Sequence, residues 1–189
     1  VAGDGGDNFT VHIDDINQID STSVSADLNT VYNFDAPNTT YTLTDFGEAR
    51  SSVGVGPLDG GGMPEAGTDG LVGQVRLETF ATSFAGTILG GVDGFANPIP
   101  FTPTRTTVRM RVWTPAANTA VELKVEDAED PDRFASDLQF TAGAGWQTLD
   151  FDFSAIEQME TFELLVLVFE PGTARTGIVY YFDDVELLP

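Results

Sequence analysis

The chain has 189 residues, 41% of them hydrophobic, and its 30 acidic residues outnumber its 8 basic residues to give a formal net charge of −22. This length and apolar content predict one domain with a sizeable core, whereas the charge excludes nucleic-acid binding through a basic patch and opposes binding to anionic membranes. There is no cysteine, which excludes disulfides and thiol chemistry. No apolar run approaches the roughly 18 residues of a membrane-spanning helix.

The first predicted element is a strand from Phe9 to Ile16, which aligns without a gap with residues 178–185 near the other end of the chain. Both segments have aromatic or β-branched residues, then Asp-Asp, then Ile or Val. Alternation places Phe9, Val11 and Ile13 on one face of this strand. The chain thus holds two copies of a terminal strand and one copy of the domain between them. Either the first copy is left over from an upstream module, or it pairs with another molecule.

A polar segment, residues 17–29, separates this strand from the main domain, so we expect an N-terminal extension over 1–29 and a β-sandwich domain over 30–189. The weaker strand candidates of that domain are short apolar runs separated by turn residues, namely Tyr32 to Phe34, Tyr41 to Phe46, Gly73 to Phe80 and Ser83 to Leu89. Two stretches rich in Gly and Pro, 54–70 and 90–100, predict long loops.

The clearest strands follow in the second half of the chain. The segments 107–113, 121–126 and 146–153 alternate between apolar and polar residues, and 162–169 is more fully apolar. Helical periodicity is nearly absent, so the pattern predicts an all-β fold, a two-sheet antiparallel β-sandwich or jelly roll. The predicted core consists of the apolar residues on the inward positions: Val108, Met110, Val112, Val121, Leu123, Val125, Leu149, Phe151, Phe153, Leu165 and Leu167.

Several motifs resemble jelly-roll carbohydrate-binding modules that accompany glycoside hydrolases, including laminarinase-like enzymes, in marine and other environmental bacteria. They occur in the same order, at Ile99–Thr102, Thr107–Pro115, Val121–Ala128, Gly145–Ser154 and Tyr180–Leu187. The resemblance extends from about Val31 to Leu188. It implies a non-catalytic, extracellular module that binds a polysaccharide such as a β-glucan.

The same resemblance implies a structural Ca²⁺ between an early strand, a loop and the last strand. Mapped onto this chain, Asp183 or Asp184 supplies the closing carboxylate, with Asp35 and Asp69 opposite. Carboxylate oxygens suit a hard cation that takes six to eight oxygen ligands. The alternative interpretation is that Asp183 and Asp184 only end a hydrogen-bonded strand edge.

Sugar binding needs aromatic platforms beside polar side chains, and the two tryptophans are the large platforms available. We therefore predict ligand contacts from Trp113 and Trp146, or a structural role for both as caps of the core. The outward-facing Arg109, Arg111, Glu122 and Lys124, with Glu126, can line the same sheet face and bond hydroxyls, or form cross-strand ion pairs on a solvated surface. Phe95, in the second loop, is a further exposed-aromatic candidate.

Catalysis has little support in the sequence. The only histidine is His12, in the N-terminal extension, so a Ser-His-Asp triad and a histidine-rich metal site are excluded. Acids without a cleft are usually solvated surface, and we do not expect an enzyme. The rival hypothesis is structural: the strand at residues 8–16 can add to a sheet edge of another copy, head to tail, and build an extracellular filament or surface layer.

Overall fold

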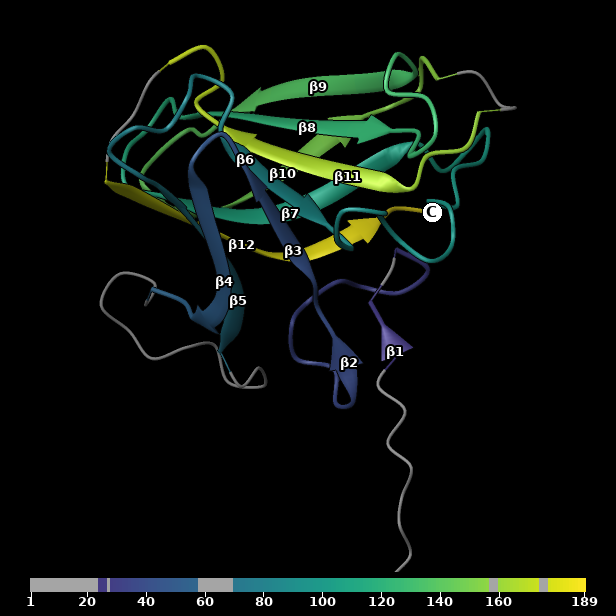
Figure 1. Ribbon diagram of the computed structural model, residues 1–189, viewed down its shortest axis with the longest axis horizontal. Coiled ribbons are helices and arrows are strands. Elements are labelled where there is room, and N and C mark those ends of the chain that lie inside the picture. Colours follow the sequence, from purple (N-terminus) through teal and green to yellow (C-terminus); the bar gives the residue numbers. More distant parts are fainter. Residues whose placement is uncertain (1–23, 27, 58–69, 157–159, 174–176) are drawn as a thin grey trace, which may run out of the picture.

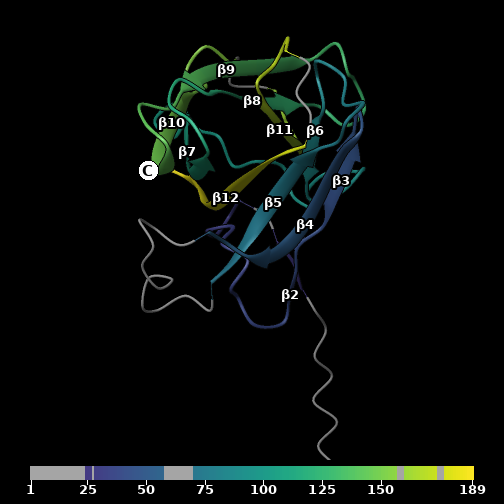
Figure 2. The ribbon, with the colours of Figure 1, turned by 90° about the vertical axis from the view of Figure 1, so that its left-hand side faces the viewer.

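Two antiparallel sheets of five strands each pack face to face as a β-sandwich (Figures 1 and 2). The computed structural model describes residues 24–26, 28–57, 70–156, 160–173 and 177–189. Within these ranges every regular element is a strand. The described residues therefore contain no helix that is long and apolar enough to cross a membrane. The predicted two-sheet β-sandwich is confirmed.

The strand order of each sheet follows from its backbone pairing. The first sheet runs β10 (Gly145–Asp152), β7 (Thr107–Thr114), β12 (Ile178–Leu187), β5 (Leu71–Leu77) and β4 (Ala49–Val55). The second sheet runs β3 (Leu43–Phe46), β6 (Gly86–Leu89), β11 (Leu164–Phe169), β8 (Ala120–Glu126) and β9 (Phe134–Phe140). A short parallel pair, β1 (Val24–Ser25) and β2 (Thr39–Thr40), lies at the lower end of the molecule in Figure 1.

The core lies between the sheets and contains all the residues that alternation predicted for it. Val108, Met110 and Val112 of β7 are fully buried, and so are Val121 and Leu123 of β8. Because successive side chains of a strand point to opposite faces, the residues between them face outward. The two sheets therefore each present one outer face to ligands or partners.

Strand β11 is an exception to this alternation, because it is apolar on both faces. Leu165 and Leu167 belong to the main core, whereas Leu164, Val166 and Val168 form a second, smaller cluster on the outer face of their sheet. The more continuous apolar character of the predicted segment 162–169 is thus explained by burial on both sides.

Some predicted elements change in the structure. Tyr32 to Phe34 forms only an isolated bridge, between Tyr32 and Val185. Strands β4 and β9 were not predicted. The described part of the predicted linker packs on the domain, with Ala26 and Leu28 buried. The predicted N-terminal strand lies outside the described residues.

The segment 90–100 contains no strand, in agreement with the predicted loop. The prediction that Phe95 is an exposed aromatic is wrong. Its side chain is 3% exposed and packs against Tyr32, with the ring centroids 6.0 Å apart. Gly90, with a positive φ of 90°, lets the backbone turn beside this ring, where a β-carbon would collide with it.

Candidate functional site

Three aromatic side chains form a row across the outer face of the first sheet. Trp146 in β10 lies opposite Trp113 in β7, and Trp113 lies opposite Tyr181 in β12. All three occupy outward positions, because their neighbours Val112 and Phe182 face the core. We call Trp113, Trp146 and Tyr181 the aromatic face. Neither tryptophan belongs to the main core.

Neighbouring groups hold these rings in place. The rings of Trp113 and Tyr181 meet edge to face with their centroids 5.5 Å apart. The guanidinium of Arg111 lies 5.1 Å from the centroid of Trp146, a cation–π distance. The indole N–H of Trp146 donates a hydrogen bond of 3.1 Å to the carbonyl of Pro57. The platform is therefore ordered before any ligand arrives, which lowers the entropic cost of binding.

Two hollows lie side by side on this face. The first, of about 390 Å³, is lined mainly by apolar groups that include Trp113, Tyr181 and Pro115. The second, of about 260 Å³, is lined mainly by polar groups that include Arg109 and Arg111. Trp113, Arg111 and Arg109 alternate along one side of β7, so the two hollows follow one strand as an apolar half and a polar half.

The polar half contains paired charges. Arg109 donates two hydrogen bonds to Asp150, of 2.7 and 2.9 Å, and this contact holds the pKa of Asp150 below its usual value. Arg111 donates to Asp184 at 3.1 Å. Asp184 and Glu186 line this hollow together with the two arginines, so its charges balance, and Asp150 adds a third acid beside Arg109. Such a surface offers fixed donors and acceptors to hydroxyl groups but no net positive charge to an anion.

The structure separates the remaining predicted ligand residues from this face. Glu122, Lys124 and Glu126 lie in β8, on the outer face of the second sheet, where Lys124 pairs with Glu126 at 2.6 Å. The prediction that they line one face with Arg109 and Arg111 is therefore wrong. The physical reason is that β7 and β8, although consecutive, belong to opposite sheets.

A buried acidic pair lies where β12 is irregular. The pairing of β12 with β7 shifts between Asp183 and Glu186, and Asp184 has a positive φ of 48°. This bulge turns Asp184 to the outer face and leaves Asp183 only 3% exposed. Oδ1 of Asp183 is buried without a hydrogen-bond partner in the described part of the chain, and both carboxylate oxygens of Asp35 are also buried.

These two carboxyl groups lie close enough for their charges to interact. Burial, followed by the charges of Asp184 and Asp35, raises the pKa of Asp183 to about 7. Burial also raises the pKa of nearby Tyr41, with smaller contributions from Asp35 and Asp183. Of the four predicted metal ligands, the structure thus brings Asp35 and Asp183 together and turns Asp184 toward Arg111, while Asp69 lies outside the described residues.

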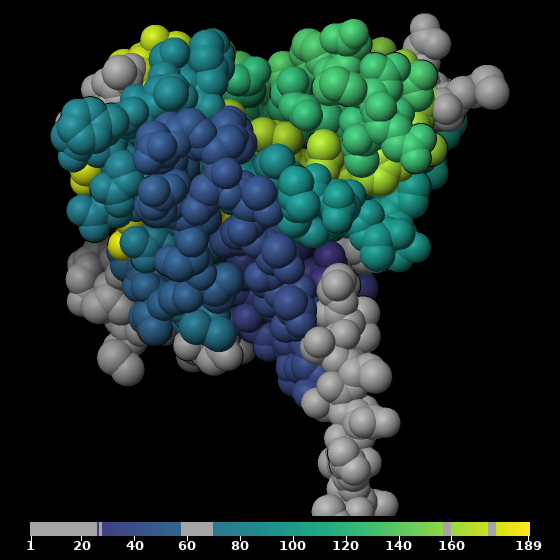
Figure 3. Space-filling view, in the orientation of Figure 1, coloured from purple at the N-terminus to yellow at the C-terminus, as the bar shows by residue number. Residues whose placement is uncertain are grey.

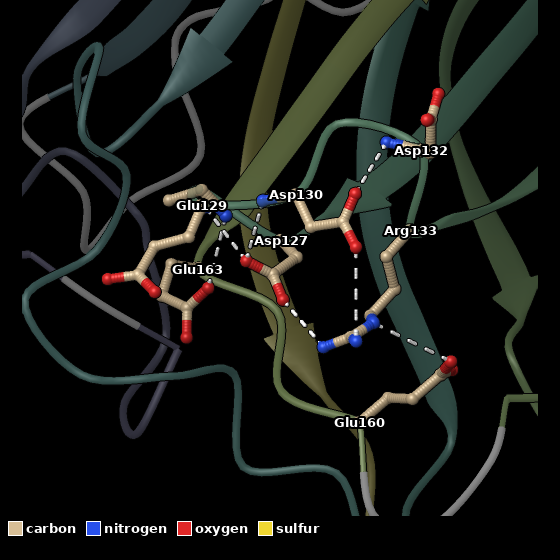
Figure 4. Close-up of polar contacts among 8 residues, drawn as sticks. Asp127, Glu129, Asp130, Asp132, Arg133, Glu160 and Glu163 are labelled. Atoms are coloured by element: carbon tan, nitrogen blue, oxygen red, sulfur yellow. Dashed lines mark hydrogen bonds and ion pairs between the residues drawn. The ribbon is translucent and has the colours of Figure 1, made fainter.

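A larger acidic cluster surrounds Arg133 in the connection between β8 and β9 (Figure 4). Arg133 contacts Asp127 at 2.9 Å, Asp130 at 3.9 Å and Glu160 at 4.0 Å. Its guanidinium occupies the centre of the cluster and neutralises part of the acidic charge. Over the residues that the structure describes, no group of three or more His, Cys, Asp or Glu side chains is arranged to hold a metal ion.

Sequence reasoning missed Tyr181 and the acidic partners of the two arginines. Tyr181 lies in an aromatic run, Tyr180 to Phe182, in which the sequence does not show which ring faces outward. Asp150 alternates with the core residues Leu149 and Phe151, so its outward position was readable from the pattern. Its pairing with Arg109 depends on the strand order, which the pattern does not contain.

No protein-family model and no curated protein sequence matches the chain. Among solved structures, it is similar to the family 11 carbohydrate-binding module of the cellulosomal cellulase Lic26A-Cel5E of Clostridium thermocellum. The TM-score is 0.52 at 8% identity, over 84% of this chain and 93% of that chain. It is also similar to part of an arabinose-bound GH51 α-L-arabinofuranosidase, with a TM-score of 0.51 at 16% identity, over 78% of this chain and 23% of that chain.

A third similar structure is a variant of a family 29 carbohydrate-binding module in complex with mannohexaose. Its TM-score is 0.49 at 11% identity, over 82% of this chain and 87% of that chain. At these identities the first two structures establish a likeness of fold. The chain therefore has a β-sandwich fold similar to that of a carbohydrate-binding module.

Proposed function

We propose that this chain is a non-catalytic module that binds a polysaccharide across the aromatic face. The observation that carries the proposal is the row of Trp146, Trp113 and Tyr181 on three adjacent strands, beside a polar hollow on the same sheet. Apolar sugar faces stack on aromatic rings, and sugar hydroxyls bond to charged and polar side chains. Both kinds of group lie along β7, which suits an extended chain of sugars.

The charge of this face favours a neutral polysaccharide. Asp150, Asp184 and Glu186 outnumber Arg109 and Arg111, and the whole chain carries a net charge of −22. A carboxylated or sulfated glycan is repelled by such a field. We infer a β-glucan as the ligand, and a glycoside hydrolase of the laminarinase-like kind as the enzyme that the module accompanies.

The test is binding to a soluble β-glucan, measured by isothermal titration calorimetry. Trp113→Ala and Tyr181→Ala each weaken binding at least tenfold while the thermal unfolding transition persists. The matched control is Phe134→Ala, which removes a half-exposed aromatic ring from the opposite sheet and leaves the affinity unchanged. Equal affinity of the Trp113 variant and the unaltered protein would refute the proposed site.

We further propose that Asp35 and Asp183 hold a structural Ca²⁺. The support is the fit of the donor set: buried carboxylate oxygens from two segments, one of them lacking a hydrogen-bond partner. Calcium takes oxygen ligands of this kind, and neighbouring carbonyl groups can supply the rest. A bound cation neutralises the two charges and joins the last strand to the segment that follows Tyr32. Titration calorimetry with CaCl₂ tests this directly, and Asp35→Asn is expected to abolish the binding heat.

We also place the protein outside the cell, where the millimolar calcium suits a modest-affinity site. Comparing the amount of the protein in the culture fluid with the amount in the cell fraction tests this location.

Self-assembly through residues 8–16 is the second proposed function, either instead of sugar binding or together with it. What favours it is the exposed edge of the second sheet at β9, which pairs with β8 alone.

A further inference from the structure

Strand β9 is an unusually apolar edge strand. It is last in the second sheet, and β8 is the only described strand that pairs with it. Its outward positions carry Phe134, Leu138 and Phe140, which are 53%, 43% and 53% exposed. Natural edge strands usually carry charges, prolines or bulges that prevent pairing with another chain. β9 has one charged residue, Asp137, and no lysine, arginine or proline, and the green surface of this region lies at the upper right of Figure 3.

The other long edge strands are less suitable acceptors. In β4, the backbone N–H of Ser51 already donates to Oδ2 of Asp45 at 3.0 Å. In β10, the backbone N–H of Asp152 already donates to Oδ2 of Asp137 at 2.8 Å; this contact uses a backbone group of β10 but only a side chain of β9. Strand β3 is only four residues long, against seven for β9. Among the described edges, β9 therefore offers the longest row of apolar side chains to an added strand.

We propose that residues Phe9 to Ile13 of one copy pair in antiparallel register with Ser136 to Phe140 of another copy. In this register Phe9 lies opposite Phe140, Val11 opposite Leu138, and His12 opposite Asp137. Aromatic and aliphatic side chains that face each other across two strands stabilise a sheet.

The segment with the same pattern, at the other end of the chain, forms a strand. Residues 178–185, which align with residues 9–16, lie in β12 and have strands paired on both sides. Tyr180 and Phe182, the counterparts of Val11 and Ile13, are buried. The proposed strand thus repeats a pattern that this fold uses at the centre of a sheet.

The geometry favours a head-to-tail assembly. The described chain begins at β1, at the lower end of the molecule, whereas β9 lies at its upper edge (Figures 1 and 2). The ten residues 14–23 can span at most about 35 Å when extended. Donor and acceptor surfaces are different, so each copy can give one strand and accept one, and an open chain of subunits results.

Engineered cysteines provide the test, because the native chain has none. The full-length double variant with Val11→Cys and Leu138→Cys is oxidised and analysed on a non-reducing gel. Directly opposite residues bring their β-carbons close enough for a disulfide, so a ladder of covalent oligomers is expected. The control combines Val11→Cys with Val55→Cys, which is 66% exposed on the edge strand β4, and yields monomers. Monomers from both proteins, an intrachain disulfide, or equal ladders overturn the proposal.

A second measurement does not depend on disulfide geometry. Sedimentation velocity of the full chain is expected to show oligomers that increase with ionic strength, because salt screens repulsion between copies that each carry a charge of −22. Leu138→Lys shifts the protein to monomer, whereas Val92→Lys, at a 69% exposed loop position, does not. A chain that is monomeric at high concentration and high salt refutes the assembly. The proposed sugar site lies on the first sheet and Leu138 on the second, so Leu138→Lys is expected to leave glucan binding unchanged. Glucan titration of the same variants therefore shows whether the assembly proposal or the sugar-binding proposal has failed.

Discussion

Replacing Asp183 by asparagine is expected to have opposite effects in the absence and presence of calcium. Asp183 is 3% exposed, and burial, followed by the charges of Asp184 and Asp35, raises its pKa to about 7. In the unfolded chain an aspartate has a pKa of about 3.9. Between these two pKa values, therefore, the carboxyl group of Asp183 is protonated in the metal-free folded state and ionised in the unfolded state.

The sign and size of the effect follow from this difference. The contribution of protonated Asp183 to the free energy of unfolding is fully present below the pKa of the unfolded state. It is lost as the pH rises through the folded-state pKa of about 7. A difference of about three pKa units corresponds to about 4 kcal/mol in the free energy of unfolding, as an upper figure. In EDTA at pH 8, Asp183→Asn removes this penalty and stabilises the protein. In calcium, the same substitution removes a ligand, and the gain in stability that the metal gives the unaltered protein is lost.

Urea denaturation followed by tryptophan fluorescence at pH 5, 6, 7 and 8, in EDTA and in CaCl₂, measures these differences. Asp93→Asn, which alters an exposed acid, serves as the charge control. The difference between the variant and the unaltered protein isolates Asp183 from the other titrating acids. If the two proteins lose stability in parallel from pH 5 to pH 8 in EDTA, the reasoning about Asp183 is wrong.

Three further substitutions test the packing and the charges. Gly73→Ala is expected to lower the free energy of unfolding by about 1–3 kcal/mol, because a β-carbon there collides with the ring of Phe182; Gly54→Ala, which meets no atom within 4 Å, is the control in urea denaturation. Arg133→Ala leaves Asp127, which is 8% exposed, without its cation and is expected to cost about 1–3 kcal/mol; an increase in the urea midpoint would contradict this. Arg109→Ala is expected to raise the pKa of Asp150 toward its usual value, as measured by NMR titration, and an unchanged titration would show that the hydrogen bonds do not form in solution.

The strands of the main domain were readable where burial is one-sided. Alternation in β7, β8 and β10 reflects one face in the core and one in solvent, so the inward residues could be named from the sequence. Strand β9 was not predicted. In this strand the half-exposed Phe134, Leu138 and Phe140 alternate with Ala135, Asp137 and Gln139. Alternation separates the two faces of a strand, but it does not indicate that the apolar face of this strand points outward.

The candidate site was predicted only in part. Trp113 and Trp146 were predicted as platforms because they are the large aromatic side chains available, and the register places them opposite each other. Lys124 was grouped with Arg111 because both alternate outward, yet the two lie on opposite sheets. Asp183 and Asp184 are adjacent in sequence, but the bulge in β12 sends one into the interior and the other to the surface.

The sequence by itself determined the all-β class, the core residues and the absence of cysteine chemistry, because composition and alternation are local properties of the chain. Only the tertiary structure decided which sheet each strand joins, and hence which outward side chains share a face. Those groupings depend on pairings between distant segments, such as β12 between β7 and β5. The aromatic face, the buried Asp35–Asp183 pair and the open edge at β9 all arise from such long-range contacts.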